Sequence, residues 1–220
     1  MGTCCHGHLL LRCSLSANRV WVCLLLLAGR RLTAPVKLGA GIARLACDDA
    51  WRLLAITTSG SVRLLDVEPL RTVLTASLAP LLEGGASVLD ARLSRTGLPL
   101  ITLSNAQAYA WSSDLEAWLC LADDSCAASQ FAPMLRLASQ GELSSLQAQA
   151  LRTALPWSGA GAAALMPGSP AQQRQLSRAH LEANLAGALA LQSPQEYRRW
   201  LVTYIRFLTG GLAVCCSSHP

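Results

Sequence analysis

The chain has 220 residues, of which 52% are hydrophobic and only 14% are charged. This length and apolar content can supply the core of one large domain or two small ones, so disorder throughout is excluded. Because roughly 25% of the residues in an average soluble domain are charged, we expect part of this protein's surface to be apolar and to bind a partner.

The formal net charge of +5 raises the possibility of nucleic-acid binding. The arginines are scattered, however, with adjacent pairs only at Arg30-Arg31 and Arg198-Arg199, and Lys37 is the one lysine. Neutralising DNA phosphates needs several cations clustered on one face. The sequence therefore predicts no direct nucleic-acid partner.

The nine cysteines contain no CxxC pair and are odd in number, which is typical of reduced thiols in the cytosol or nucleus rather than of a disulfide scaffold. Four side chains near the start, Cys4, Cys5, His6 and His8, could be drawn as zinc ligands. Such crowding allows few tetrahedral geometries and lacks the usual two separated ligand pairs. We expect no metal site.

The apolar run Val20–Ala28 has the length of a signal-peptide core. It is too short to cross a bilayer, which needs about 20 apolar residues. No clear cleavage signal follows it, since Gly29 and two arginines come next. The run predicts a buried strand, and we expect no membrane partner. Residues 1–19 before it show no sustained period.

Two β-hairpins are predicted from alternating apolar and β-branched runs joined by turn residues. The first pairs Leu53–Thr57 with Val62–Val67, and the second pairs Leu100–Leu103 with Ala108–Trp111. Each hairpin is followed by a further apolar stretch, as an outer strand should be.

The two hairpins have the spacing of a repeat. Leu65 and Trp111 occupy equivalent places and lie 46 positions apart, close to the roughly 40 to 45 residues of a WD-type propeller blade. A propeller needs at least about four blades to close. The missing blades must come from weaker segments here, from another part of a longer chain, or from another subunit.

The region rich in Ser, Gln, Ala, Gly and Pro before the last third of the chain predicts a linker. Within it, Gly159, Gly161 and Ala164 imitate the dinucleotide-binding motif G-x-G-x-x-A. That motif must leave a strand and open a helix, whereas here it follows Pro156-Trp157 in Ala/Gly-rich sequence. We expect no cofactor.

The last third predicts a helical hairpin. Ser169 offers an N-cap, Pro170 suits the first helical position, and leucines then recur every four residues from Leu181 to Leu189. Ser193–Glu196 repeats the start signal, and the apolar face that follows ends at Gly210-Gly211.

These patterns predict an α+β fold, with antiparallel WD/propeller-like β-blades followed by a C-terminal helical hairpin. The expected division is residues 1–19 without assigned structure, 20–137 as the propeller-like β region, 138–168 as a linker, 169–209 as the helical hairpin, and 210–220 as a divergent tail.

No catalytic constellation is apparent. The chain lacks a G-x-S-x-G elbow, a phosphate loop and an H-E-x-x-H motif. His180 is predicted on a helix surface without an acid or nucleophile partner, and the acidic pairs Asp48-Asp49 and Asp123-Asp124 lie beside strand ends, where Asp makes turns. The sequence predicts that this protein is not an enzyme.

Tryptophan is the residue type most enriched where partner proteins bind. Five of the six tryptophans lie in the patterned part of the chain, and we expect three of these five to pack in the core: they are Trp51, Trp111, Trp118, Trp157 and Trp200. Trp157, in the predicted linker, and Trp200 are the candidate partner contacts.

Several segments together resemble the HIRA (histone regulator A) family over about residues 28–209. They are Ala28–Leu32, Ser61–Val67, Gly97–Asn105, Ala179–Glu182, and Leu189–Ser193 leading into Glu196–Leu201. The segments in the two helices are the most specific. The blade-like pieces alone could belong to many WD-repeat proteins.

The resemblance implies a nuclear subunit of the complex that deposits the replacement variant of histone H3 independently of replication and represses histone genes. It implies a C-terminal region without catalytic role that self-associates as a homotrimer. It also implies binding to the large calcineurin-binding scaffold subunit and only indirect contact with the histone H3 variant.

Two departures from the family stand out. Leu65-Asp66 replaces a Trp-Asp pair in a region similar to one implicated in self-association, which makes Leu65 and Asp66 candidate self-association residues. Because leucine buries less area than tryptophan, association is expected to be weaker or to use other contacts. Residues 1–27 and those beyond about Gly210 match poorly, so we expect a truncated or mispredicted gene product.

An alternative function rests on the repeat alone: a WD-type protein-interaction scaffold of unrelated cytoplasmic function. The helices discriminate between the two hypotheses, because a chaperone-complex partner should need them and an unrelated ligand of the blade surface should not.

Overall fold

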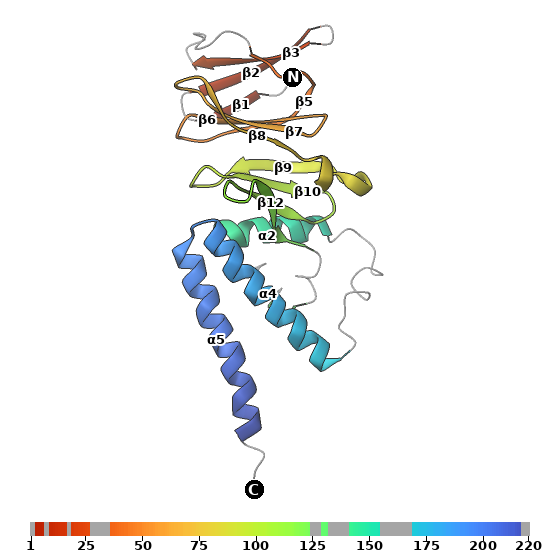
Figure 1. The fold of residues 1–220 in the computed structure, drawn as a ribbon, viewed down its shortest axis with the longest axis vertical. Helices are drawn as coiled ribbons and strands as arrows, with labels where there is room; N and C mark the ends of the chain where they lie inside the picture. The colour runs from red at the N-terminus through yellow and green to blue at the C-terminus, as the bar shows by residue number, and fades with distance from the viewer. Residues whose placement is uncertain are drawn as a thin grey trace. The chain divides into compact units, whose positions relative to one another are not determined.

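The computed structural model describes residues 3–6, 9–16, 19–26, 36–123, 129–131, 141–154 and 169–216. It divides the chain into two compact units, residues 1–103 and residues 104–220. Figure 1 shows the elements and labels most of them.

The strands form three four-stranded antiparallel sheets, in the orders β1-β2-β3-β4, β5-β6-β7-β8 and β12-β11-β10-β9. Their bounds are β1 Thr3–His6, β2 Leu9–Ser16, β3 Arg19–Leu26, β4 Val36–Lys37, β5 Ile42–Cys47, β6 Arg52–Thr57, β7 Ser61–Asp66, β8 Arg71–Ser77, β9 Val88–Leu93, β10 Pro99–Leu103, β11 Ala108–Ser112 and β12 Ala117–Ala122. Short 3-10 turns at Ala79–Leu81 and Glu83–Gly85 precede β9. With the helices described below, this confirms the α+β class.

The first sheet corrects the predicted division of the chain. Residues 1–19 were assigned no structure, yet β1 and β2 lie there, and β2 pairs with β3 in continuous antiparallel register, from Leu9 opposite Leu26 to Ser16 opposite Arg19. β3 covers most of the predicted strand Val20–Ala28, whose last two residues lie outside the described residues. The sequence of this region shows no regular alternation of apolar and polar residues. Its strands are instead identified by their hydrogen bonds to neighbouring strands.

The second and third sheets confirm the two predicted hairpins and their repeat. Leu65 lies in β7 and Trp111 in β11, each the third strand of its sheet in chain order. The second strands are the most apolar: β10 is buried along its whole length and β6 everywhere except Arg52. Inward-facing residues of β6 and β7, together with Leu38 and Val67 just after β4 and β7, form a core cluster in unit 1, made of Leu38, Leu53, Ala55, Leu65 and Val67.

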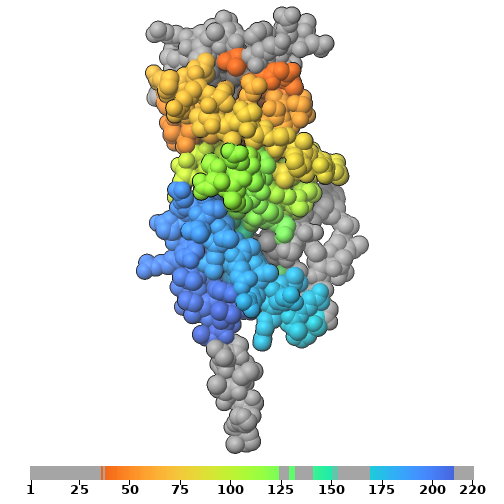
Figure 2. Space-filling model, in the orientation of Figure 1, coloured from red at the N-terminus to blue at the C-terminus, as the bar shows by residue number. Residues whose placement is uncertain are grey.

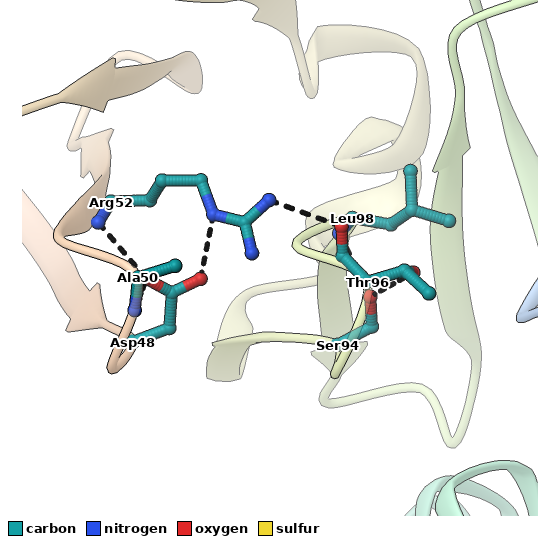
Figure 3. Close-up of polar contacts among 6 residues, drawn as sticks. All are labelled: Asp48, Ala50, Arg52, Ser94, Thr96 and Leu98. Atoms are coloured by element: carbon teal, nitrogen blue, oxygen red, sulfur yellow. Dashed lines mark hydrogen bonds and ion pairs between the residues drawn. The ribbon is translucent and has the colours of Figure 1, made fainter.

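Within unit 1, Arg52 of β6 ties the second sheet to the hairpin of β9 and β10. Its Nε lies 2.8 Å from Asp48 Oδ2, and its Nη1 donates to the Thr96 carbonyl oxygen at 3.0 Å (Figure 3). A Cβ on Gly97 would lie 1.6 Å from that Nη1, and Gly97 has a φ of +86°. Only glycine fits this turn beside the guanidinium.

Unit 2 carries three described helices: α2 Glu142–Ala154, α4 Pro170–Ala190 and α5 Pro194–Cys216. Ser169 caps α4 as predicted, since its hydroxyl accepts a hydrogen bond from the Gln172 N–H at 3.2 Å. α4 and α5 form the predicted hairpin and diverge away from their short connection (Figure 1). None of the helices among the described residues is both long enough and apolar enough to cross a membrane.

Two predictions about these helices are wrong. α2 lies inside the predicted linker 138–168, because Leu143, Leu146 and Ala150 at helical spacing are buried. α5 does not stop at Gly210-Gly211 but continues to Cys216, into the predicted tail 210–220. A glycine inside a helix costs only about 1 kcal/mol relative to alanine. The pair Gly210-Gly211 can therefore lie inside α5 without ending it. Residues 155–168 lie outside the described residues.

Candidate interaction surface

The predicted self-association residues lie at the end of β7 in unit 1. Leu65 belongs to the core cluster and is only 6% exposed, so its side chain offers almost no surface. Asp66 is bound by Arg71 across the β7–β8 pair, with Arg71 Nε 2.7 Å from Asp66 Oδ2. Of the two candidates, Asp66 with its arginine is the one that a partner could reach.

Two exposed apolar side chains lie at the same end of that sheet. Trp51 precedes β6 and Leu70 precedes β8, and they are 37% and 46% exposed. The turn before β6 lies beside the turn between β7 and β8, because Arg52 pairs with Asp66 in register. The Val67 N–H donates to the Trp51 carbonyl oxygen at 2.8 Å. We call Trp51, Asp66, Leu70 and Arg71 the β-turn patch.

In unit 2 a buried carboxylate joins α5 to α2. Glu196 accepts hydrogen bonds from the backbone N–H groups of Leu143 and Ser144, both at 3.0 Å, and from the Ser144 hydroxyl at 2.9 Å. A Cβ on Gly141 would lie 2.0 Å from Glu196 Oε1. A negative charge at a helix N-terminus satisfies free N–H groups and complements the helix dipole. Glu196 therefore caps α2, although the sequence indicated it only as a start signal for its own helix.

A buried amide pair joins α2 to α4 and to the last strand. Gln147 Nε2 donates both to the Leu121 carbonyl oxygen at 3.0 Å and to Asn184 Oδ1 at 2.5 Å. Gln147 and Asn184 are fully buried. Because a buried polar group is costly unless it is paired, these bonds stabilise the contact of α2 with α4 and β12.

His180 is buried in α4, and its prediction as a helix-surface residue is wrong. Burial lowers the pKa of His180 to about 4, against a smaller opposing effect of the Asp123 carboxylate. Its ring lies 6.1 Å from that of Trp200, centroid to centroid. The side chain is therefore neutral at physiological pH and belongs to the helix interface.

Trp200 is completely buried, so the structure does not support it as a partner contact. It fills the interface of α4 and α5 beside His180. Trp111 is also buried and meets the half-buried Trp118 edge to face at 5.2 Å, whereas Trp51 is exposed. Trp157 lies outside the described residues, and its role as a partner contact stays a prediction.

The side of α5 next to the one that carries Trp200 is apolar and open to solvent. Tyr197, Leu201, Ile205 and Leu208 recur at intervals of four, four and three residues, which places them on one side of a helix. Each is between 36% and 51% exposed. We call these four residues the α5 stripe. α5 lies at the surface of unit 2 beside α4, in dark blue in Figure 2.

Among the side chains that the structure describes, the titratable groups show no arrangement typical of catalysis. The pKa of Glu182 is lowered because the Tyr204 hydroxyl and Arg178 donate to it, at 2.6 and 2.9 Å, but it lies exposed on α4. Among residues whose side chains are described, no three His, Cys, Asp or Glu gather as metal ligands do. The side chains of Cys4, Cys5, His6 and His8 lie outside that set.

Sequence reasoning missed the cap formed by Glu196, the burial of His180 and the whole of α2. A signal for α2 was present in the spacing of Leu143, Leu146 and Ala150. No local signal could have indicated the hydrogen bonds that Ser144 donates to Glu196, because the two residues are 52 positions apart.

Comparison with known proteins gives a consistent result. The family model described as "Hira: TUP1-like enhancer of split" matches residues 29–211. Protein HIRA from Oryza sativa is 34% identical over 195 residues, and human Protein HIRA is 32% identical over 189 residues; each alignment covers 82% of this chain.

A crystal structure of HIRA residues 644–1017 superimposes with a TM-score of 0.64 at 27% identity, covering 96% of this chain and 64% of that one. The chain spans only 18 to 19% of the length of the curated HIRA proteins it matches. Since the family match includes the second and third β-sheets and most of the described helical residues, this chain belongs to the HIRA family.

Proposed function

We propose that this chain is a non-enzymatic assembly module of a HIRA-type histone chaperone complex. The observation that carries the proposal is the family match over residues 29–211, which takes in β4 to β12, α2, α4 and most of α5. The lack of a catalytic arrangement among the described side chains is compatible with an assembly role.

In this proposal the module acts in the nucleus, in replication-independent nucleosome assembly and in repression of histone genes. Its direct protein partner is the large calcineurin-binding scaffold subunit, and it meets the histone H3 variant only through the complex. No direct nucleic-acid contact and no cofactor is involved.

The module also associates with itself, with a homotrimer as the expected state. The β-turn patch supports this proposal, because Asp66 and Arg71 offer a charged pair flanked by the exposed side chains of Trp51 and Leu70. Leu65 contributes by packing beneath the patch in the core cluster rather than by touching the partner.

A WD-type interaction scaffold of unrelated cytoplasmic function is the alternative. The repeat of β5–β8 and β9–β12 supports it, since four-stranded meanders of this kind serve many binding functions. It predicts a ligand of the strands that ignores α4 and α5.

The experiment is affinity capture of the tagged full chain from nuclear extract, followed by mass spectrometry. We expect the calcineurin-binding scaffold subunit and HIRA subunits to be enriched. A bait with Trp200→Ala, which disrupts the packing of α4 against α5, should no longer capture these subunits. A second bait with Trp51→Asn changes the β-turn patch and leaves the helices intact.

A well-folded wild-type bait that recovers neither subunit would contradict the assembly role. Recovery of some other protein, equally by wild type and by Trp200→Ala, would instead favour the alternative scaffold.

A further inference from the structure

Among the residues that the structure describes, none covers the α5 stripe. The inward side of α5 is already occupied, because Trp200 packs against α4 and Glu196 caps α2. The stripe residues remain between 36% and 51% exposed, and Val202 beside them is 42% exposed. Since contiguous apolar patches are uncommon on the surface of monomeric proteins, this face has the character of a binding surface.

A basic row runs alongside the stripe. Arg198, Val202 and Arg206 repeat the four-residue spacing of Tyr197, Leu201 and Ile205 one position further along the helix, so they form the adjacent row. Both arginines are exposed. Glu196 is the one acidic residue of α5, and it is buried at the start of α2. The solvent-facing charge of α5 is therefore entirely positive.

These charges favour one kind of occupant. A second copy that docked its own stripe here with the two α5 helices antiparallel would bring the two Arg198–Arg206 rows side by side, and like charges in contact are destabilising. An amphipathic helix whose apolar face is flanked by Asp or Glu would bury the stripe and pair with the arginines.

We propose that the α5 stripe docks an acidic amphipathic helix of a partner protein, with Arg198 and Arg206 fixing its orientation. The inference rests on the proposed function, which it deepens by naming the surface and the chemistry of the partner. Leu201 and Ile205 lie at the centre of the stripe, where the energy of an interface is concentrated.

The test uses two synthetic helical peptides that are long enough to cover the α5 stripe. Both have the same leucine stripe, flanked by Glu in one and by Lys in the other, and binding to the full chain is followed by fluorescence anisotropy. We expect the acidic peptide to bind, more weakly as salt is raised, and the basic peptide not to bind.

Three variants sharpen the test. Ile205→Asp should weaken binding of the acidic peptide by about tenfold or more, since it places a carboxylate in the apolar contact. Arg206→Glu should weaken the binding of the acidic peptide and strengthen the binding of the basic peptide. Leu189→Asp is the matched control, because Leu189 is 69% exposed on α4 and outside the stripe. Circular dichroism establishes that each variant is folded.

Other results would overturn the inference. These are equal binding of both peptides, binding of neither, or a dimer in sedimentation that Ile205→Asp dissociates, which would make a second copy the occupant. If wild type and Ile205→Asp capture the scaffold subunit equally well, the inference fails while the proposed function stands. If neither captures it but the peptide results hold, the function fails and the docking surface stands.

Discussion

Glu196 on α5 accepts two hydrogen bonds from Ser144 at the start of α2, one from the backbone N–H at 3.0 Å and one from the hydroxyl at 2.9 Å. A residue of the helical hairpin thus completes the N-terminus of a helix that precedes it by some 50 positions. The cap makes the folding of α2 depend on the docking of α5, since free N–H groups in a buried helix end are costly.

Glu196→Ala is expected to lower the free energy of unfolding by about 2 to 3 kcal/mol, because it leaves the buried N–H groups of Leu143 and Ser144 unpaired. Urea denaturation followed by circular dichroism measures the loss. Gln195→Ala changes the exposed neighbour in the same helical turn and should have little effect. An equal loss in the two variants would contradict the capping role.

Gly97→Ala is expected to be more destabilising than Gly39→Ala. Both glycines have a φ of +86°, which costs alanine about 1 kcal/mol, but only Gly97 has the Arg52 guanidinium where a Cβ would lie. Moving that side chain adds about 1 to 3 kcal/mol. Thermal or urea denaturation measures the difference.

Adding Arg52→Ala to Gly97→Ala should recover part of the excess loss, as a double-mutant cycle would show. If the two glycine variants were equally stable, the close approach of Arg52 to the turn would be refuted.

His180 makes the stability of the protein depend on pH. Its pKa is about 4 when folded and near 6.5 when unfolded, so between these values the unfolded chain binds the extra proton. The contribution of neutral His180 to the free energy of unfolding is fully present above pH 6.5 and falls as the pH drops towards 4. From pH 7 to pH 5 the loss is on the order of 2 kcal/mol.

His180→Gln cannot titrate, so its stability should fall less between pH 7 and pH 5 than that of the wild type, whatever its stability at pH 7. Urea denaturation at both pH values gives the two differences. Equal differences in the two proteins would show that His180 is not held neutral by burial.

Asp66→Arg is expected to shift the protein from oligomer towards monomer in analytical ultracentrifugation, because it replaces the Asp66–Arg71 pair by two like charges at the β-turn patch. Asp114→Arg makes the same change of charge in an exposed turn of unit 2 and should leave the distribution unchanged. An Asp66→Arg variant that associates as the wild type does would exclude the patch from the self-association surface.

Much of the fold could be predicted because it follows from local patterns. The alternation in Leu53–Thr57 and Val62–Val67 indicated a hairpin, and the 46-residue offset of Leu65 and Trp111 placed both on equivalent strands. The N-cap at Ser169 and the spacing of apolar residues indicated the helical hairpin. These signals depend only on neighbouring residues, whose periods differ between helix and strand.

The candidate sites were less predictable, because burial depends on what packs against a residue. Trp200 looked like a partner contact and His180 like a surface residue, yet each is buried where α4 meets α5. The α5 stripe has the same helical spacing as a core face, and the sequence alone could not tell the covered side of α5 from the open one.

The sequence by itself therefore determined the α+β class, the repeated hairpins, the two last helices and, through its matching segments, the family. Only the tertiary structure decided that Glu196 caps α2, that Leu65 lies in the core while Asp66 stays accessible, and that one face of α5 is free. The physical reason is that periodicity and capping act within a few residues, whereas burial and the pairing of charges are set by groups distant along the chain.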